Sequence, residues 1–193
     1  MQFTYHGVEM PGFLHLYNLT WFNERTVELA VAYAFLEGRE GIGLEIGNVL
    51  GHYGPFTHSV VDRYEQAAWH QTQDVHNVDI FDVCGRWDWI VSISTIEHIR
   101  WDEPERDPRG AVAALAYLRR LLAPGGRALV SFPLGYHPGL DEIVVEGRTG
   151  AERSTTLVRA SAEEWVETVE PQIIPYGSLD PWAASLFIGE FMA

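Results

Sequence analysis

The stretch Gly43-Leu-Glu-Ile-Gly-Asn-Val-Leu-Gly-His-Tyr53 contains an apolar strand, a carboxylate and two spaced glycines. Glycines at such a turn let the backbone approach a ligand where a Cβ would clash. A second short apolar strand, Thr57 to Asp62, also ends in an acid. In a doubly wound sheet an acid at this place accepts hydrogen bonds from a ribose diol. Together the two strands predict a site for a nucleoside-containing cofactor.

The composition predicts a globular protein with a small-molecule partner. The chain has 193 residues, of which 47% are hydrophobic and 21% charged, enough for one well-buried core. Its formal net charge of -14 opposes binding to phosphate backbones and to anionic lipid surfaces. We therefore expect a small-molecule acceptor as partner, no nucleic acid and no membrane. The oligomeric state stays open, a homodimer included.

The cysteine content and the N-terminus bear on the compartment. Cys84 is the single cysteine, so neither an intramolecular disulfide nor a zinc cluster of thiolates can form. The first residues lack a basic flank with an apolar run behind it, and no stretch is long and apolar enough for a bilayer. These features predict a soluble, cytoplasmic protein.

Strands and helices alternate along most of the chain, which predicts the α/β class. We expect one domain over 1–193, with an N-terminal aromatic cap and helix over 1–38 and a cofactor-binding core over 39–193. The expected strands are 42–46, 57–62, 75–80, 87–94, 127–132, 155–159 and 185–191, and the expected helices are 23–38, 48–53, 63–70, 110–122 and one begun by Ser161 and Glu164 as a capping box. The predicted fold is doubly wound, with a mainly parallel seven-stranded sheet and an antiparallel last strand.

The order of these motifs resembles the class I S-adenosylmethionine-dependent methyltransferases, from about residue 40 to the C-terminus. Glu45-Ile-Gly47 resembles the first motif of that family, Asp62 its ribose-binding acid and Asp79-Ile80 its adenine-contacting step. Asp88-Trp-Ile-Val-Ser-Ile-Ser94 is similar to the fourth strand, and Leu122-Ala-Pro-Gly-Gly126 to the turn before the fifth. Three further segments look like small bacterial members that tailor natural products or glycans: Asn23 to Glu28, Ser94 to His98, and Gly135 to Asp141.

The resemblance implies a Rossmann-like methyltransferase fold, S-adenosylmethionine as cofactor and a set of contacts. Glu45 would orient the methionine ammonium through water or directly, Asp62 would hold the ribose hydroxyls and Asp79 would accept from the adenine amino group, with Asp82 as its rival. The implied cofactor-binding residues are Glu45, Gly47, Asn48, Asp62, Asp79, Ile80 and Ser94. One departure is Val49, which stands where the family usually has a glycine, so only Gly47 and Gly51 remain. The missing third glycine also argues against a dinucleotide-dependent dehydrogenase.

Methyl transfer to a hydroxyl needs a base, and two histidines are candidates for it. His98 follows the fourth predicted strand, where Glu97, Asp102 or Glu103 could orient it, and His137 follows the fifth. Each of them is also compatible with a merely structural role. His98 with Asp102, or His137 with Asp141, leaves a divalent-metal site as a weaker alternative, and the expected metal content is none.

The aromatic N-terminal segment has two interpretations. It caps the apolar edge of the sheet, or it closes over the acceptor and shelters the sulfonium by cation–π contacts. In the second case Tyr5, Tyr17, Trp21 and, after the fifth strand, Tyr136 bind the substrate. His6 would also belong to that set.

The sequence thus predicts an S-adenosylmethionine-dependent methyltransferase. Its predicted acceptor is a hydroxyl, or an amine, of a small molecule such as a natural product or a sugar. The alternative is a noncatalytic nucleoside-binding or scaffold protein that keeps the fold, which Val49 in the glycine turn makes credible.

Overall fold

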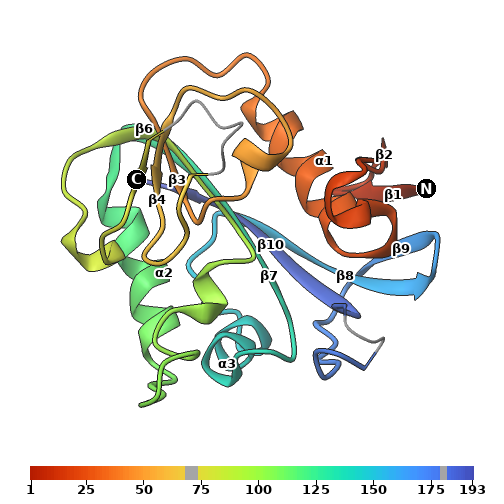
Figure 1. Cartoon of the computed structure of the whole chain (residues 1–193). Coiled ribbons are helices and arrows are strands. Elements are labelled where there is room, and N and C mark those ends of the chain that lie inside the picture. The colour runs from red at the N-terminus through yellow and green to blue at the C-terminus, as the bar shows by residue number, and fades with distance from the viewer. Residues whose placement is uncertain (68–73, 179–181) are drawn as a thin grey trace.

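One mixed sheet of ten strands runs through the molecule (Figure 1). The computed structural model describes residues 1–67, 74–178 and 182–193. From one edge to the other, the strands are β2 (Val8–Pro11), β1 (Gln2–Tyr5), β9 (Glu164–Thr168), β8 (Arg153–Ser161), β10 (Ser185–Met192), β7 (Leu122–Pro133), β6 (Trp87–Ile93), β3 (Gly43–Ile46), β4 (Ser59–Val61) and β5 (Val75–His76).

The strand directions divide the sheet into two parts. Strands β5, β4, β3, β6 and β7 are parallel, and β10 inserts antiparallel between β7 and β8. The expected parallel sheet and antiparallel last strand are therefore present, but the expected total of seven strands is wrong. The additional strands are β9 and the hairpin of β1 and β2, joined through the parallel pair of β1 and β9.

Helices cover both faces of the sheet, as a doubly wound arrangement requires (Figure 1). Helix α1 (Arg25–Leu36) packs with Val91, Ile93 and Leu129 on one face. Helices α2 (Gly110–Arg120) and α3 (Pro138–Val145) pack with Ile90 and Val130 on the other. Neighbouring residues of β6 and β7 thus enter opposite cores, because side chains alternate along a strand.

Several connections are short 3-10 turns. The structure has η1 (Tyr17–Phe22), η2 (Leu50–His52), η3 (Ile80–Asp82) and η4 (Ile96–His98). The helix expected over 48–53 is reduced to η2. The strand expected over 75–80 is reduced to β5, residues 77–79 are irregular, and Ile80 begins η3. Residues 63–67 are not helical. Oδ1 of Asp62 accepts from the backbone amides of Tyr64 and Glu65, as the N-cap residue of a helix does, yet no helical turn follows within residues 63–67. Residues 68–70 of that expected helix lie outside the described residues.

The C-terminal region contradicts the expected helix after Ser161. Ser161 Oγ does accept a backbone amide, that of Glu163 at 3.2 Å, but the segment that follows is strand β9. Trp165 is 2% exposed and Val166 43%, the alternation of a strand with one buried face. Pairing with β8 and β1 makes this segment a strand, although the local sequence carries a helix-capping signal.

Helix α3 was not expected from the sequence. Pro138 occupies its first turn, where a missing amide costs nothing, and the side chain of His137 accepts from the amide of Leu140. Among the described residues, no helix has both the length and the apolar character needed to cross a membrane.

Candidate functional site

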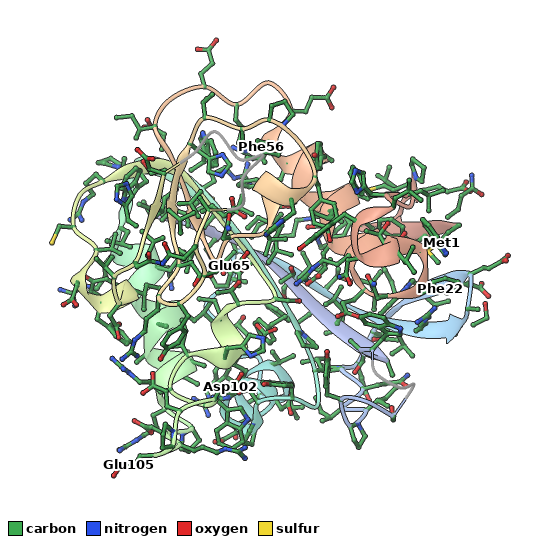
Figure 2. The ribbon with its side chains drawn as sticks, viewed as in Figure 1. Met1, Phe22, Phe56, Glu65, Asp102 and Glu105 are labelled. Atoms are coloured by element: carbon green, nitrogen blue, oxygen red, sulfur yellow. The ribbon has the colours of Figure 1, made fainter. Side chains whose placement is uncertain are left out.

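A cleft of about 830 Å³ opens at the carboxyl ends of the parallel strands. In open α/β sheets this edge is where ligands bind, and the volume lies within the range of small-molecule sites. Figure 2 places Glu65 and Asp102, which both line the cleft, apart from Met1 and Phe22. The lining residues include Arg25, Ile46, Gly47, Asn48, Val49, Val61, Asp62, Arg63, Glu65, Val78, Asp79, Ile80, Ser94, Thr95, His98, Ile99, Asp102, Glu103 and Pro104.

Gly47 forms the turn at the end of β3. Its φ is 90°, and a Cβ built on it would lie 1.9 Å from Oγ1 of Thr95. Its amide donates to the carbonyl of Val61 at 2.8 Å, which binds the turn to β4. A glycine is therefore required both by the backbone conformation and by the contact with Thr95. Val49, in contrast, is accommodated in the lining of the cleft.

Glu45 lies under this turn rather than in the cleft. Oε1 accepts from the amides of Val49 and Leu50 at 2.8 and 2.6 Å, and Oε2 contacts Nε2 of His58 at 2.7 Å. The residue is fully buried and is not part of the cleft lining. A direct contact of Glu45 with a cofactor ammonium is not what this geometry provides. The carboxylate instead takes the amides at the start of η2.

Asp62 stands at the tip of β4 and faces the cleft. Oδ1 accepts from the amides of Tyr64 and Glu65 at 2.9 and 2.7 Å, and Oδ2 from the amide of Asn48 at 3.2 Å. A carboxylate offers about four lone-pair positions, so acceptor capacity remains on Oδ2. Asn48 also donates through Nδ2 to Glu65 Oε1 at 3.2 Å.

Asp79 belongs to a ring of four charges, of which Arg63, Asp79 and Glu103 line the cleft. Its Oδ2 pairs with Arg100 at 2.6 Å and with Arg63 at 3.3 Å, and both arginines also pair with Glu103. We call Arg63, Asp79, Arg100 and Glu103 the charge ring. These pairs connect the loop after η4 to Arg63, which follows β4, and to Asp79, which precedes η3. The apolar side chains of Val78, Ile80, Ile99 and Pro104 line the cleft beside it.

His98, Asp102 and Tyr136 form a hydrogen-bonded triad, of which His98 and Asp102 line the cleft. Nδ1 of His98 contacts Asp102 Oδ2 at 2.6 Å and the Tyr136 hydroxyl at 3.1 Å. The hydroxyl donates to Asp102 Oδ1 at 2.7 Å. Burial, together with the charge of Asp102, raises the pKa of Tyr136, so the phenol remains a donor. The carboxylate favours a proton on Nδ1, which leaves Nε2 as the basic nitrogen.

Ser94 links the cleft to buried charge behind it. Its φ is 39°, an uncommon backbone conformation for a residue with a side chain. The hydroxyl donates to Oε1 of Glu28 at 2.7 Å, and the same oxygen accepts from Ser131 at 2.8 Å. Oε2 of Glu28 pairs with Arg25, which itself lines the cleft.

His137, the second predicted base, does not line the cleft. It is fully buried, and its Nδ1 accepts from the amide of Leu140 at 3.2 Å as the N-cap of α3. Burial lowers the pKa of His137 and keeps the ring neutral. This geometry makes His137 the cap of α3, away from the cleft lining, and does not support the prediction that it acts as a base. Asp141 is also engaged elsewhere, since Oδ1 accepts from the amide of Gly135 at 3.0 Å.

The predicted substrate-binding aromatics are separated in the structure. Tyr5 lies on β1, with its hydroxyl 3.4 Å from Oε1 of Glu190, and neither Tyr5 nor Trp21 lines the cleft. Tyr17 stacks on His52 with ring centroids 4.7 Å apart, outside the lining. Of the four, Tyr136 is the one that hydrogen-bonds to His98, the cleft residue predicted to act as the base. The prediction that Tyr5 and Trp21 form a substrate lid is not supported by their positions.

Arg25 and Arg63 line the cleft although the sequence did not predict them there, and Arg100 reaches the site through its pair with Asp79 without lining the cleft. Arg25 falls within the segment Asn23 to Glu28, to which no binding role was attached, and Arg63 and Arg100 lie just after predicted motifs. A lone arginine in a helix or loop carries no periodic signal. Their partners come from distant segments, such as Asp79 for Arg100. Within the described ranges, no group of three or more His, Cys, Asp or Glu side chains is arranged to hold a metal ion.

No protein-family model matches the sequence, and no curated protein matches it. Solved structures do. The N-methyltransferase NodS from Bradyrhizobium japonicum WM9, in complex with S-adenosyl-L-homocysteine, has 16% identity and a TM-score of 0.51, over 87% of this chain and 86% of that one. A possible histamine N-methyltransferase from Thermotoga maritima has 18% identity and a TM-score of 0.48, over 84% and 86%. With NodS as its structural neighbour, the chain has the Rossmann-like fold of the S-adenosylmethionine-dependent methyltransferases.

Proposed function

We propose that the protein transfers a methyl group from S-adenosylmethionine to a hydroxyl or an amine of a small molecule. The observation that carries this proposal is the cleft at the carboxyl ends of β3, β4 and β6, with Gly47 at its floor and Asp62 at its side. This is the edge at which a sheet of this fold binds a nucleoside. The bound cofactor would supply a methyl group on a positively charged sulfur.

The residues present fit such a cofactor. Gly47 leaves the backbone open beside the ligand, and Asp62 retains acceptor capacity for ribose hydroxyls. Val78, Ile80 and Ile99 offer apolar walls for an adenine ring. Asp79, at the same end, shares its carboxylate with two arginines, so an adenine amino group would join the charge ring as a further donor.

His98 is the base in this proposal. Asp102 holds Nδ1 and thereby orients Nε2 as proton acceptor, and Tyr136 fixes both groups through its hydroxyl. Methyl transfer is an in-line displacement, so alignment and exclusion of water are the other tasks of the site. The strained backbone of Ser94, beside His98 in the lining, is consistent with a functional position.

A noncatalytic nucleoside-binding or scaffold protein is the second candidate. It is favoured by Val49, which lines the cleft in place of a glycine. Such a protein would bind the nucleoside and transfer no methyl group.

Calorimetry with S-adenosylmethionine and S-adenosylhomocysteine tests the first step. We expect binding, and Asp62→Ala and Asp62→Asn should each weaken it about tenfold or more, a loss of about 1.4 kcal/mol. Asp82→Ala is the matched control, because this exposed acid follows the cleft residue Ile80 without lining the cleft. No binding at millimolar cofactor, or an unchanged affinity of both Asp62 variants, would contradict the proposal. A labelled-methyl assay then separates the enzyme from the scaffold.

A further inference from the structure

Arg25 is a cation of the cleft wall that a buried carboxylate holds from behind. It is the first residue of α1, its side chain is 16% exposed, and it lines the cleft. Its Nη1 donates to Oε2 of the buried Glu28. Oε1 of Glu28 accepts from the hydroxyls of Ser94 and Ser131 at 2.7 and 2.8 Å. Both oxygens of Glu28 are thus engaged, and the guanidinium is fixed in the wall.

This arrangement costs free energy that packing alone does not explain. A buried carboxylate loses its hydration, and well-packed apolar residues often replace a buried ion pair without loss of stability. Ser94 adds an uncommon backbone conformation, with φ 39°, of the kind that clusters at active sites and ligand clamps. Both features lead to Arg25, because Ser94 binds Glu28 and Glu28 binds the guanidinium.

One side of the guanidinium is left for a ligand. Among the residues that the structure describes, Nη1 of Arg25 pairs with Glu28, and Nε and Nη2 have no hydrogen-bond partner. Nε and Nη2 carry parallel N–H groups, the fork that binds both oxygens of a carboxylate. A lysine in this place would offer a point charge and no fork.

The other charges of the lining disfavour a carboxylate elsewhere in the cleft. Arg63, the second arginine of the lining, already pairs with two acids of the same lining, Asp79 and Glu103. The acid that pairs with Arg25 is Glu28, which lies behind the wall and outside the lining. The cleft side of Arg25 therefore offers a carboxylate two N–H groups and no opposing acid of its own pair.

We propose that Arg25 is the carboxylate-binding residue of the cleft and that Glu28, held by Ser94 and Ser131, positions its guanidinium. The proposal rests on the methyl-transfer function proposed above and deepens it. Arg25 contacts the ligand, whereas Glu28 and Ser131 act on the ligand through Arg25.

The carboxylate has two potential sources. The amino-acid end of S-adenosylmethionine carries one, and a carboxylate on the methyl acceptor is the other. Ser94 and His98 line the cleft together with Arg25, so the wall that holds the guanidinium also carries the proposed base. The chemistry at Arg25 is the same for both sources, and the two arms of the experiment distinguish them.

Calorimetry with two ligands that differ in the carboxylate alone is the first arm. S-adenosylhomocysteine has the complete amino-acid end, and S-adenosyl-3-thiopropylamine is the same molecule without its carboxylate. If the cofactor supplies the carboxylate, the wild type should bind S-adenosylhomocysteine about tenfold more tightly or more, and Arg25→Gln should bind both nearly equally. Because the two affinities are compared within one variant, a general loss of stability leaves their ratio unchanged.

Thermal melting with sodium acetate, against sodium chloride at equal ionic strength, is the second arm. It is run on the free protein and on the protein saturated with S-adenosylhomocysteine. If the acceptor supplies the carboxylate, acetate should raise the Tm of the saturated wild type by about 2–4 °C at concentrations several times its Kd. If the cofactor supplies it, acetate should raise the Tm of the free protein alone. Arg25→Gln should show neither rise.

Three further variants keep the test decisive. Arg25→Lys retains a positive charge beside Glu28 and removes the fork, so it should stay folded and lose most of the discrimination. Glu28→Gln keeps the shape of the buried side chain and loses its charge, so the affinity ratio, or the response to acetate, should fall about threefold or more. Arg109→Gln, which changes an exposed arginine outside the lining, should match the wild type.

Each outcome decides one claim. Loss of discrimination in both Arg25 variants supports the proposal, and the arm in which it occurs names the source of the carboxylate. A wild-type affinity ratio and acetate response in both Arg25 variants would overturn the assignment of Arg25, and in Glu28→Gln they would overturn the positioning role of Glu28. If neither adenosyl compound binds, the proposed function fails instead, and acetate with the free protein still tests Arg25.

Discussion

Gly47 combines two constraints that can be tested separately. Its φ of 90° disfavours any side chain, and the adjacent Thr95 fills the space of a Cβ. Gly47→Ala should lower the affinity for S-adenosylhomocysteine about tenfold or more, because the turn must move away from Thr95. Gly125→Ala is the matched control, since its φ is 80° but nothing lies within 4 Å of its Cβ position.

Calorimetry and thermal melts distinguish the results for these two glycine variants. Both should lose some stability through backbone strain, and only Gly47→Ala should lose binding. If Gly47→Ala and Gly125→Ala bind S-adenosylhomocysteine with equal affinity, the close backbone approach at Gly47 does not contribute to ligand binding.

Glu97 should give the protein a specific pH dependence. Because burial raises its pKa, the folded state binds this proton more tightly than the unfolded chain does. The resulting stabilisation is complete below the ordinary carboxyl pKa and is lost as the pH rises towards the folded-state value. Glu97→Gln removes that dependence. The free energy of unfolding of the variant, relative to that of the wild type, should therefore increase by about 1 kcal/mol between pH 4 and pH 8.

Urea unfolding at a series of pH values measures this difference. Glu163→Gln, which changes an exposed glutamate, should run parallel to the wild type. A constant difference between Glu97→Gln and the wild type across the pH range would mean that Glu97 is ionised in the folded protein as readily as in the unfolded chain.

Individual site residues were predictable where a strand end fixed them. Gly47, Asp62 and Asp79 follow apolar runs, so the carboxyl edge of a parallel sheet brings them to one cleft. Glu45 was placed in the right turn, but its side chain binds amides of that turn, which the linear pattern does not distinguish from a ligand contact. His137 followed the same rule as His98, yet the proline after it starts a helix that uses the imidazole as its cap.

At the scale of elements, local signals failed where tertiary pairing overrode them. Ser161 makes the side-chain bond of a capping residue, but the segment pairs with β8 and β1 and becomes strand β9. The parallel strands β3, β4 and β6 and helices α1 and α2 were predicted near their observed bounds, because long apolar patterns determine them. The β1–β2 hairpin was missed because the segment 1–22 as a whole has no clean period, although polar and apolar residues alternate along Gln2–Tyr5 and the turn at His6 and Gly7 has positive φ.

The charge ring joins three elements that the sequence keeps apart: β4, η3 and the loop after η4. Arg100→Gln removes its pairs with Asp79 and Glu103 and should loosen the loop that brings Ile99 and Pro104 to the cleft. We expect roughly threefold weaker binding of S-adenosylhomocysteine, since partly exposed ion pairs contribute roughly 0.2–1 kcal/mol each. Raising the salt concentration should weaken wild-type binding more than that of the variant.

Arg109→Gln is the control for this effect, because Arg109 pairs with Asp107 on the same loop and does not line the cleft. Its affinity should equal that of the wild type at each salt concentration. Identical salt dependence of the wild type and Arg100→Gln would exclude the charge ring as a support of the binding site.

At the scale of the molecule, the cleft and the N-terminal hairpin lie at different parts of the sheet. The cleft lies at β3, β4 and β6, whereas β1 and β2 form the opposite edge of the ten-stranded order. Phe3 of β1 and Trp165 of β9 belong to the same buried hydrophobic cluster as the apolar residues of α1. The core on the α1 face of the sheet therefore continues to that edge. The β1–β2 hairpin thus extends the sheet at that edge, as the capping interpretation of the aromatic N-terminal segment predicts.

Phe3→Ala tests this separation. Phe3 is 3% exposed, and truncating a buried phenylalanine typically costs about 3–5 kcal/mol, so the free energy of unfolding should fall by about 3 kcal/mol. The affinity for S-adenosylhomocysteine, measured well below the lowered Tm, should stay within about twofold, because distant sites act independently. Val8→Ala on β2, where the side chain is 62% exposed, should change neither quantity. A tenfold loss of affinity in a folded Phe3→Ala protein would instead join the N-terminal hairpin to the cleft and restore its interpretation as a lid.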